Sequence, residues 1–476
     1  MRDSLEPRPA AADQTPSRSA PSTGRREFLA RAAAVAATLS LGCSDAASRV
    51  VSPGAGVSAS VGDDEGDETD HIPHPERSGI EHVVVVMMEN RSFDHFLGWV
   101  PKADGRQAGL VYYDRAGVPH ETHPLAPDYQ GCGHPDPDHS YEGGREEYDG
   151  GRCDGWLRAG ENDDYAIGYY TREDLAFFSR AVPDWTTADR YFTAMMGPTY
   201  PNRIYQFAAQ TDRIVNTPQP SVLPTIFDRL LARGLTALDY FSDLPSTALW
   251  GYKYAPLWRP IGAFFADAAA GQLPNFSWID PRFLGENDGT GNDDHPYADI
   301  RAGEDFLNRI YNAVTTSPAW RNTVLVINYD EWGGFFDHVA PPTRPVSAID
   351  RAAGYTDGLL GFRTPFLIVS PFARRGFVAH QQYDHTSVLR MVEWRWGLEP
   401  LTERDRTANN LARLLRLNAP PRLHAPQYLV PPILGGACPG AAVVAQSLSS
   451  GGAAAAVAAP PARAAWRELA SRVTVR

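Results

Sequence analysis

The sequence predicts an α/β fold with a mostly parallel central sheet covered by helices on both faces. Continuous apolar runs typical of buried parallel strands occupy His82–Met88, Thr323–Tyr329 and residues 364–370. Apolar residues spaced three or four positions apart, typical of helices, occupy residues 225–233, 300–314 and 385–396. Because strands alternate with helices along the chain, a parallel sheet between helical layers is the expected arrangement.

The composition of the chain excludes several classes of protein. The 476 residues are 43% hydrophobic and 21% charged, which is ordinary for a folded globular protein and unlike a coiled coil, a collagen or a fully disordered chain. Lysine and arginine number 44 against 57 acidic residues, a net charge of −13. Nucleic-acid binding needs clustered cations on the phosphates, so we expect no nucleic-acid partner.

The first 47 residues predict a disordered start followed by an export signal. Arg25 and Arg26 precede Phe28 and a short, weakly apolar run at 32–42, a pattern that resembles the twin-arginine signal. Cys43 offers a lipoprotein cleavage site, although cleavage at 44–47 by an ordinary signal peptidase is favoured. We therefore expect export through the twin-arginine machinery, to the periplasm, the cell surface or the medium.

The rest of the chain divides into three parts. Residues 48–77 are an acidic, solvated linker, residues 78–430 form the catalytic domain, and residues 431–476 are a low-complexity tail expected to dangle at the surface. Cys132 and Cys153 bracket a Gly/Asp-rich stretch, and either a disulfide between them or two free thiols agrees with the sequence.

Polar residues follow two of the predicted strands directly. Glu89 and Asn90 come after the first strand, and Asp330 and Glu331 come after the strand at 323–329. Ligands of parallel α/β sheets bind at the carboxyl ends of strands. Carboxylates gathered there repel one another unless a cation neutralises them, so the two pairs predict a divalent metal site.

A third element supplies a candidate nucleophile. Thr199 precedes a predicted helix start, where backbone N–H groups and the helix dipole favour a phosphate. Contact with the metal would acidify its hydroxyl. His139, His295 and His385, each next to an aspartate, are candidates to protonate a leaving alkoxide or to hold phosphoryl oxygens.

Four ordered motifs between residues 79 and 400 resemble the bacterial phosphoesterase family, which contains non-specific phospholipases C and acid phosphatases and belongs to the alkaline-phosphatase-like superfamily. The motifs are ENRSFDH, GPTYPNR, DEWGGFFDHV and DHTS. The resemblance implies an α/β/α sandwich and a metal held by the Glu-Asn and Asp-Glu pairs. By position these are Glu89, Asn90, Asp330 and Glu331, with Thr199 as metal-bound nucleophile. It also makes Asn202, Arg203 and His385 catalytic candidates.

The expected activity is that of a secreted phospholipase C that cleaves phospholipid phosphodiesters through a phospho-threonine. A threonine nucleophile favours this branch over the acid phosphatases, which use serine. Tyr200 and Trp332 stand where family members often have histidine, which bears on the substrate. The partner is a phospholipid or a small phosphoester, with the membrane surface met only as substrate. The alternatives are a broad-specificity phosphomonoesterase and a non-enzymatic surface lipid-binding protein.

Overall fold

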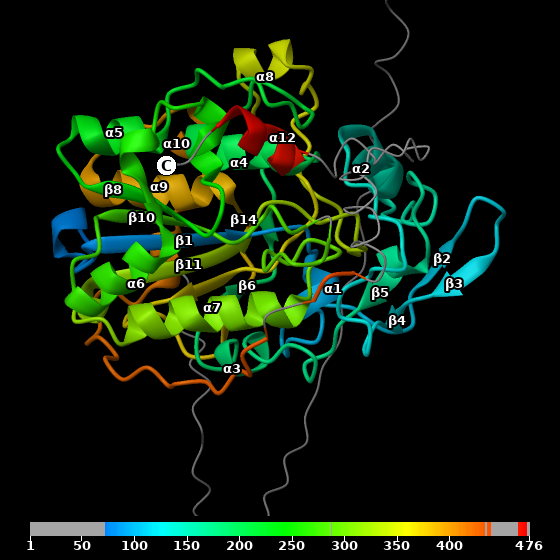
Figure 1. Ribbon diagram of the computed structural model, residues 1–476, viewed down its shortest axis with the longest axis horizontal. Helices are drawn as coiled ribbons and strands as arrows, with labels where there is room; N and C mark the ends of the chain where they lie inside the picture. Colours follow the sequence, from blue (N-terminus) through cyan, green and yellow to red (C-terminus); the bar gives the residue numbers. More distant parts are fainter. Residues whose placement is uncertain (1–71, 287, 434–435, 439–464, 474–476) are drawn as a thin grey trace, which may run out of the picture. The chain divides into compact units, whose positions relative to one another are not determined.

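An eight-stranded sheet lies at the centre of the computed structural model, which describes residues 72–286, 288–433, 436–438 and 465–473 (Figure 1). Neighbouring strands run parallel except at β12, which is antiparallel to both of its neighbours. In order across the sheet the strands are β13 (Phe377–Ala379), β6 (Thr186–Ala188), β12 (Leu367–Val369), β11 (Thr323–Tyr329), β1 (His82–Met88), β10 (Phe276–Asp280), β8 (Ala237–Phe241) and β9 (Trp258–Pro260).

Helices cover both faces of the sheet, as Figure 1 shows. On one face lie α4 (Thr199–Ala208), α5 (Ile226–Ala232) and α9 (His385–Trp396), and on the other lie α6 (Ile261–Ala270) and α7 (Ile300–Thr315). The strands β1 and β11 are buried between them, as continuous apolar runs require. The predicted α/β class with a mostly parallel sheet is confirmed, and the layers form an α/β/α sandwich.

The predicted elements match the structure closely, with one difference in direction. The runs at 82–88 and 323–329 are β1 and β11, and the three helical patterns are α5, α7 and α9. The third apolar run forms β12, which is shorter than predicted and antiparallel. A strand buried on both faces has the same apolar run in either direction, so this pattern carries no information about orientation.

Shorter elements complete the fold. The other helices are α1 (Phe93–Leu97), α2 (Tyr141–Tyr148), α3 (Phe178–Ala181), α8 (Ala348–Ala352), α10 (Glu403–Arg406) and α12 (Ala465–Arg472). The remaining strands form three small pairs: β14 (Tyr383–Asp384) with β7 (Tyr191–Phe192), β2 (Val111–Tyr113) with β3 (Pro119–Glu121), and β4 (His123–Pro124) with β5 (Gly168–Tyr169). Among the described residues, no helix is both long and apolar enough to cross a membrane.

The register of the central strands positions the polar residues that follow them. Met88 of β1 pairs with Tyr329 of β11, so the next residues, Glu89 and Asp330, leave adjacent strands at the same edge. Asp280 ends β10, the neighbour of β1 on its other side. Three parallel strands thus deliver carboxylates to one point, as expected for the carboxyl ends of a parallel sheet.

The structure corrects two expectations about the ends of the chain. Cys132 forms a disulfide with Cys438, and Cys153 is a buried free thiol, so the pairing of Cys132 with Cys153 was wrong. Part of the tail that we expected to dangle is the helix α12, whose Trp466 is 1% exposed. The predicted export signal lies outside the described residues, as do most of the acidic linker and residues 439–464 of the tail.

Candidate active site

The turns after β1 and β11 interlock at the edge of the sheet. Asn90 adopts a left-handed backbone conformation (φ 58°), which asparagine tolerates better than most residues. Its N–H donates to Asp330 Oδ1 at 3.3 Å. Gly333 approaches so closely that a Cβ there would lie 2.2 Å from the Asn90 carbonyl oxygen, and its φ is 67°. Only glycine allows this approach, which explains the glycine after Asp330-Glu331 in the motif.

Arg203 occupies the centre of the carboxylate cluster. Its guanidinium lies 3.0 Å from Glu89 Oε1, 3.2 Å from Asp330 Oδ2 and 3.5 Å from Asp280 Oδ1, and all four side chains are fully buried. Burial and the charge of Asp330 still raise the pKa of Glu89 well above its ordinary value, because Arg203 only partly offsets them. The protein therefore supplies one of the cations that the clustered carboxylates require.

Three of the predicted metal ligands retain a buried oxygen without a hydrogen bond to any described residue. These oxygens are Glu89 Oε2, Asn90 Oδ1 and Glu331 Oε1. Burying a polar oxygen without a partner costs free energy, and more so when it is ionised. Carboxylate and amide oxygens are ligands that hard divalent cations prefer. This donor set fits a divalent cation, whose charge would add to that of Arg203.

Thr199 is the first residue of α4 and is 5% exposed. It precedes Arg203 by four residues, about one turn, so the two residues share a face of α4. The helix start provides fewer free N–H groups than we expected. The Tyr200 N–H donates to Asn216 Oδ1 at 2.8 Å, and Pro201 has no N–H. Side chains must therefore supply most donors to a bound phosphoryl group.

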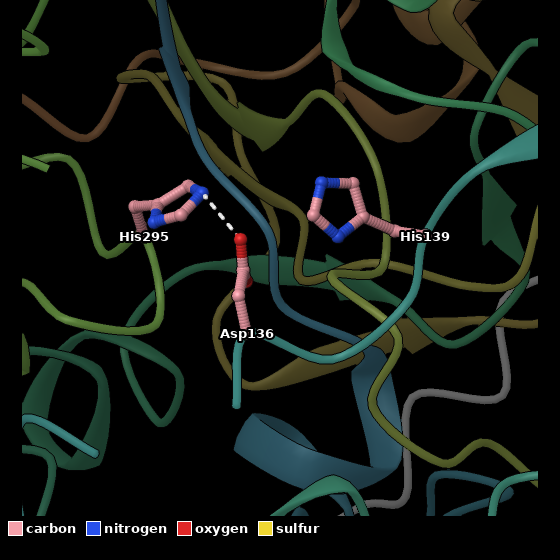
Figure 2. A group of neighbouring side chains, drawn as sticks. All are labelled: Asp136, His139 and His295. Atoms are coloured by element: carbon pink, nitrogen blue, oxygen red, sulfur yellow. Dashed lines mark ion pairs between the residues drawn. The ribbon is translucent and has the colours of Figure 1, made fainter. Parts of the chain in front are cut away.

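His139 and His295 lie on opposite sides of the Asp136 carboxylate, as Figure 2 shows. His295 Nε2 is 3.8 Å from Asp136 Oδ2, and His139 Nε2 is 3.9 Å from Glu331 Oε1 and 3.3 Å from the Asn90 amide nitrogen. Burial lowers the pKa of His139, but Glu331 and Asp136 outweigh it and raise this pKa to about 9. The protonated ring is a proton donor beside the predicted metal ligands.

His385 and Asn202 support the site through the backbone. His385 Nε2 donates to the Tyr329 carbonyl oxygen at 3.0 Å, Nδ1 accepts from the Ala194 N–H at 3.4 Å, and burial lowers its pKa to about 4. Asn202 Nδ2 donates to the Gly197 carbonyl oxygen at 2.7 Å, and its Oδ1 accepts from the Met195 N–H at 3.0 Å. Both side chains thus hold the segment that leads into Thr199, and their assignment as catalytic residues stays a prediction.

The structure adds acidic residues that we did not single out from the sequence. Glu286 lies with Glu89 and His295, their ligand atoms within 4.8 Å of one another, and a second such group joins Asp136 to the two histidines. Asp136 is the first residue of the DPDHS stretch that contains His139, so the sequence could have pointed to it. Glu286 sits in a loop with no periodic pattern, so no sequence signal marked it.

Tyr200 and Trp332, the two departures from the family pattern, are both fully buried. Trp332 Nε1 donates to Glu147 Oε2 at 2.7 Å, and Tyr200 Oη has no hydrogen-bond partner in the described part of the chain.

A third acidic group, Asp94 with Asp337 and His338, is balanced by the buried Arg363, which lies 3.0 Å from Asp94 and 2.9 Å from Asp337. We therefore assign that group no ligand.

Comparisons of the chain with known proteins find a matching family and several relatives. The model of the Phosphoesterase family matches residues 80–399. Non-specific phospholipase C1 of Arabidopsis thaliana is 29% identical over 402 residues, 75% of each chain. Phospholipase C B of Mycobacterium tuberculosis is 31% identical over 424 residues, 73% of this chain and 80% of that one. A solved alkaline phosphatase superfamily protein from Vibrio parahaemolyticus, at 9% identity, covers 72% of this chain and 70% of that one with a TM-score of 0.33, too low to support an inference.

Proposed function

This chain belongs to the Phosphoesterase family, and from that premise we propose that it is a metal-dependent phospholipase C that cleaves phospholipid phosphodiesters. The observation that carries the proposal is the set of three buried oxygens without hydrogen bonds to the described part of the chain, on Glu89, Asn90 and Glu331, where two strands of the sheet end. The names of the relatives favour a diester over a monoester substrate.

A divalent cation would be held by Glu89, Asn90, Asp330, Glu331 and the Thr199 hydroxyl. When bound, it would lower the pKa of that hydroxyl and neutralise phosphoryl charge. Restoring activity to chelated protein with single metals identifies the divalent ion that the site selects.

In the reaction we propose, Thr199 Oγ attacks phosphorus and the bond from phosphorus to the diacylglycerol oxygen breaks. The leaving oxygen takes a proton from His139, whose pKa is raised by Glu331 and Asp136, or from His295, whose Nε2 lies 3.8 Å from Asp136 Oδ2. Water then cleaves the phospho-threonine, which restores the hydroxyl and releases the phosphorylated head group. Arg203 lies between Glu89 and Asp330 and partly offsets the rise in pKa that burial causes in both carboxyl groups.

We also propose that the protein is exported by the twin-arginine route, which carries folded proteins. This fits the Arg25-Arg26 motif and a substrate class found at membrane surfaces. Cleavage of the signal at 44–47 would release the protein without an anchor, whereas cleavage directly before Cys43 would leave that cysteine to carry a lipid.

The proposal is tested by comparing three substrates with chelator-treated and metal-restored protein. Phosphatidylcholine micelles and p-nitrophenylphosphorylcholine are diesters, whereas p-nitrophenyl phosphate is a monoester. We expect hydrolysis of the diesters, its loss on chelation and its recovery with one of Mg²⁺, Ca²⁺, Mn²⁺ or Zn²⁺. Preference for the monoester would identify a phosphomonoesterase, and binding of micelles without hydrolysis would identify a lipid-binding protein. Full activity of a sample shown by elemental analysis to be metal-free would refute the metal site.

A further inference from the structure

The C-terminal helix α12 contributes a buried side chain to the candidate active site. Trp466 stacks on Phe283, with ring centroids 4.4 Å apart and planes 12° from parallel, and meets Tyr200 edge-on at 4.9 Å. Tyr200 directly follows Thr199 in α4, and Figure 1 shows α12 next to that helix. A segment predicted to dangle thus packs against the residue that follows the proposed nucleophile.

The indole of Trp466 contacts a predicted metal ligand directly. Trp466 Nε1 donates to Glu89 Oε1 at 2.9 Å, and Arg203 Nη2 donates to the same oxygen at 3.0 Å. The other oxygen, Oε2, has no hydrogen-bond partner among the described residues. Two donors on one oxygen fix the rotation of the carboxylate, which leaves Oε2 as the atom that can bind a cation.

The same ring also supports the arginine that neutralises the cluster. The Arg203 guanidinium carbon lies 5.4 Å from the Trp466 ring centroid and 4.7 Å from that of Phe283, within the range of cation–π attraction. Trp466 therefore touches both the carboxylate and its cation. Loss of the indole N–H would free Glu89 to rotate, while loss of the ring would also loosen Arg203.

Contacts of Arg467 hold α12 in this place, and Cys438 is attached to the same part of the fold. Arg467 Nη2 lies 2.9 Å from Asp288 Oδ2 and donates to the Leu284 carbonyl oxygen at 3.2 Å. Upstream of the helix, Cys438 is joined to Cys132 by the disulfide, and its N–H donates to the Asp288 carbonyl oxygen at 2.7 Å. Both attachments engage the segment that carries Phe283, the residue on which Trp466 stacks.

We propose that Trp466 is a positioning residue of the active site, which orients Glu89 so that Oε2 faces the divalent cation. This inference rests on the metal-dependent function proposed above. Partners that orient metal ligands typically change metal affinity or activity 10- to 100-fold when they are removed. Trp466 acts through Glu89 and takes no part in bond making.

The experiment compares Trp466→Phe with Arg472→Ala in the full chain. Phenylalanine keeps the ring and removes only the N–H, whereas Arg472 lies on the same helix in an exposed pair with Glu468. Affinity for Mn²⁺ is measured by titration calorimetry after chelation, alongside the thermal midpoint, kcat and KM. We expect about a 10- to 100-fold weaker Mn²⁺ affinity for W466F with a similar midpoint, and wild-type values for R472A.

A double-mutant cycle separates orientation of Glu89 from general support of the fold. In a Glu89→Ala background, adding W466F should change Mn²⁺ affinity much less than it does in the wild type, because the carboxylate that the indole orients is absent. Equal weakening in both backgrounds, or unchanged affinity in W466F, would overturn the inference. If the wild type itself bound no divalent ion, the proposed metal site would fail and this inference with it. Wild-type binding with an unaffected W466F would refute the inference alone.

Discussion

Replacing Arg203 by methionine should destabilise the metal-free protein strongly, and more at pH 7 than at pH 5. Methionine keeps much of the side-chain volume of arginine but removes its positive charge. Among the described residues, Arg203 is the only cation within 3.5 Å of all three carboxylates, Glu89, Asp330 and Asp280. All three carboxylates are fully buried, so water cannot replace the lost guanidinium.

The size of the effect follows from the cost of leaving a buried carboxylate unpaired. Removing one partner of a buried pair costs about 3–5 kcal/mol. An unpaired buried carboxylate can avoid part of this cost by taking up a proton. For an acid with an ordinary pKa near 4, protonation costs about 4 kcal/mol at pH 7 and about 1.4 kcal/mol at pH 5, which sets an upper limit on the loss for each carboxylate. For one carboxylate we therefore expect a loss of about 3–4 kcal/mol at pH 7 and of about 1.4 kcal/mol at pH 5. The loss is larger at pH 7 because a carboxyl group whose pKa is raised in the folded state favours folding only at low pH, and this contribution to stability is lost as the pH rises.

The assay is urea-induced unfolding followed by tryptophan fluorescence at both pH values, with and without Mn²⁺. Arg404→Met is the matched control, since Arg404 is also buried and pairs with an aspartate, Asp384, at 3.8 Å. At a hundredfold excess over the Kd of each variant, Mn²⁺ should add about 2.7 kcal/mol to R203M and to R404M alike, so the control compares the deficits of the metal-free proteins. A wild-type midpoint for R203M at pH 7, or an equal deficit at both pH values, would refute this account of the cluster.

Three further predictions concern the nucleophile, a buried acid and the export signal. Thr199→Ala should lower diester turnover by roughly three orders of magnitude or more with metal content unchanged, and Thr199→Ser should keep part of the activity; near-normal turnover of T199A would exclude a phospho-threonine, which acid quench and mass spectrometry detect directly. Burial raises the pKa of Glu304 to about 8, so the folded state holds an extra proton between pH 5 and 8 and its stability falls as the pH rises. Glu304→Gln should therefore reduce the slope of the free energy of unfolding against pH by about 1.4 kcal/mol per pH unit, measured by urea-induced unfolding. An unchanged slope would show that Glu304 titrates normally. Replacing Arg25 and Arg26 by lysine should retain the protein in the cytoplasm on cell fractionation, and unchanged secretion would point to the general secretory route.

Local patterns predicted the central strands and the polar residues at their ends. The apolar runs of β1 and β11 are unbroken, and Glu89, Asn90, Asp330 and Glu331 follow them directly. Because parallel strands end at the same edge of a sheet, sequence position alone was enough to bring these residues together. The helix start near Thr199 was also predicted from the local sequence, and α4 begins at that residue.

Long-range packing decided what the site contains besides those residues. Arg203 lies between carboxylates from three strands, and Trp466 reaches Glu89 from 377 residues away. Cys132 selected Cys438, 306 residues distant, over the nearby Cys153. Periodic patterns of residue types along the sequence do not encode such contacts. The contacts depend on which distant segments pack together once the sheet has formed and is buried. The sequence by itself thus determined the sheet, its polar edge and the residue types available there, whereas only the tertiary structure decided which cation, aromatic ring and disulfide completed that edge.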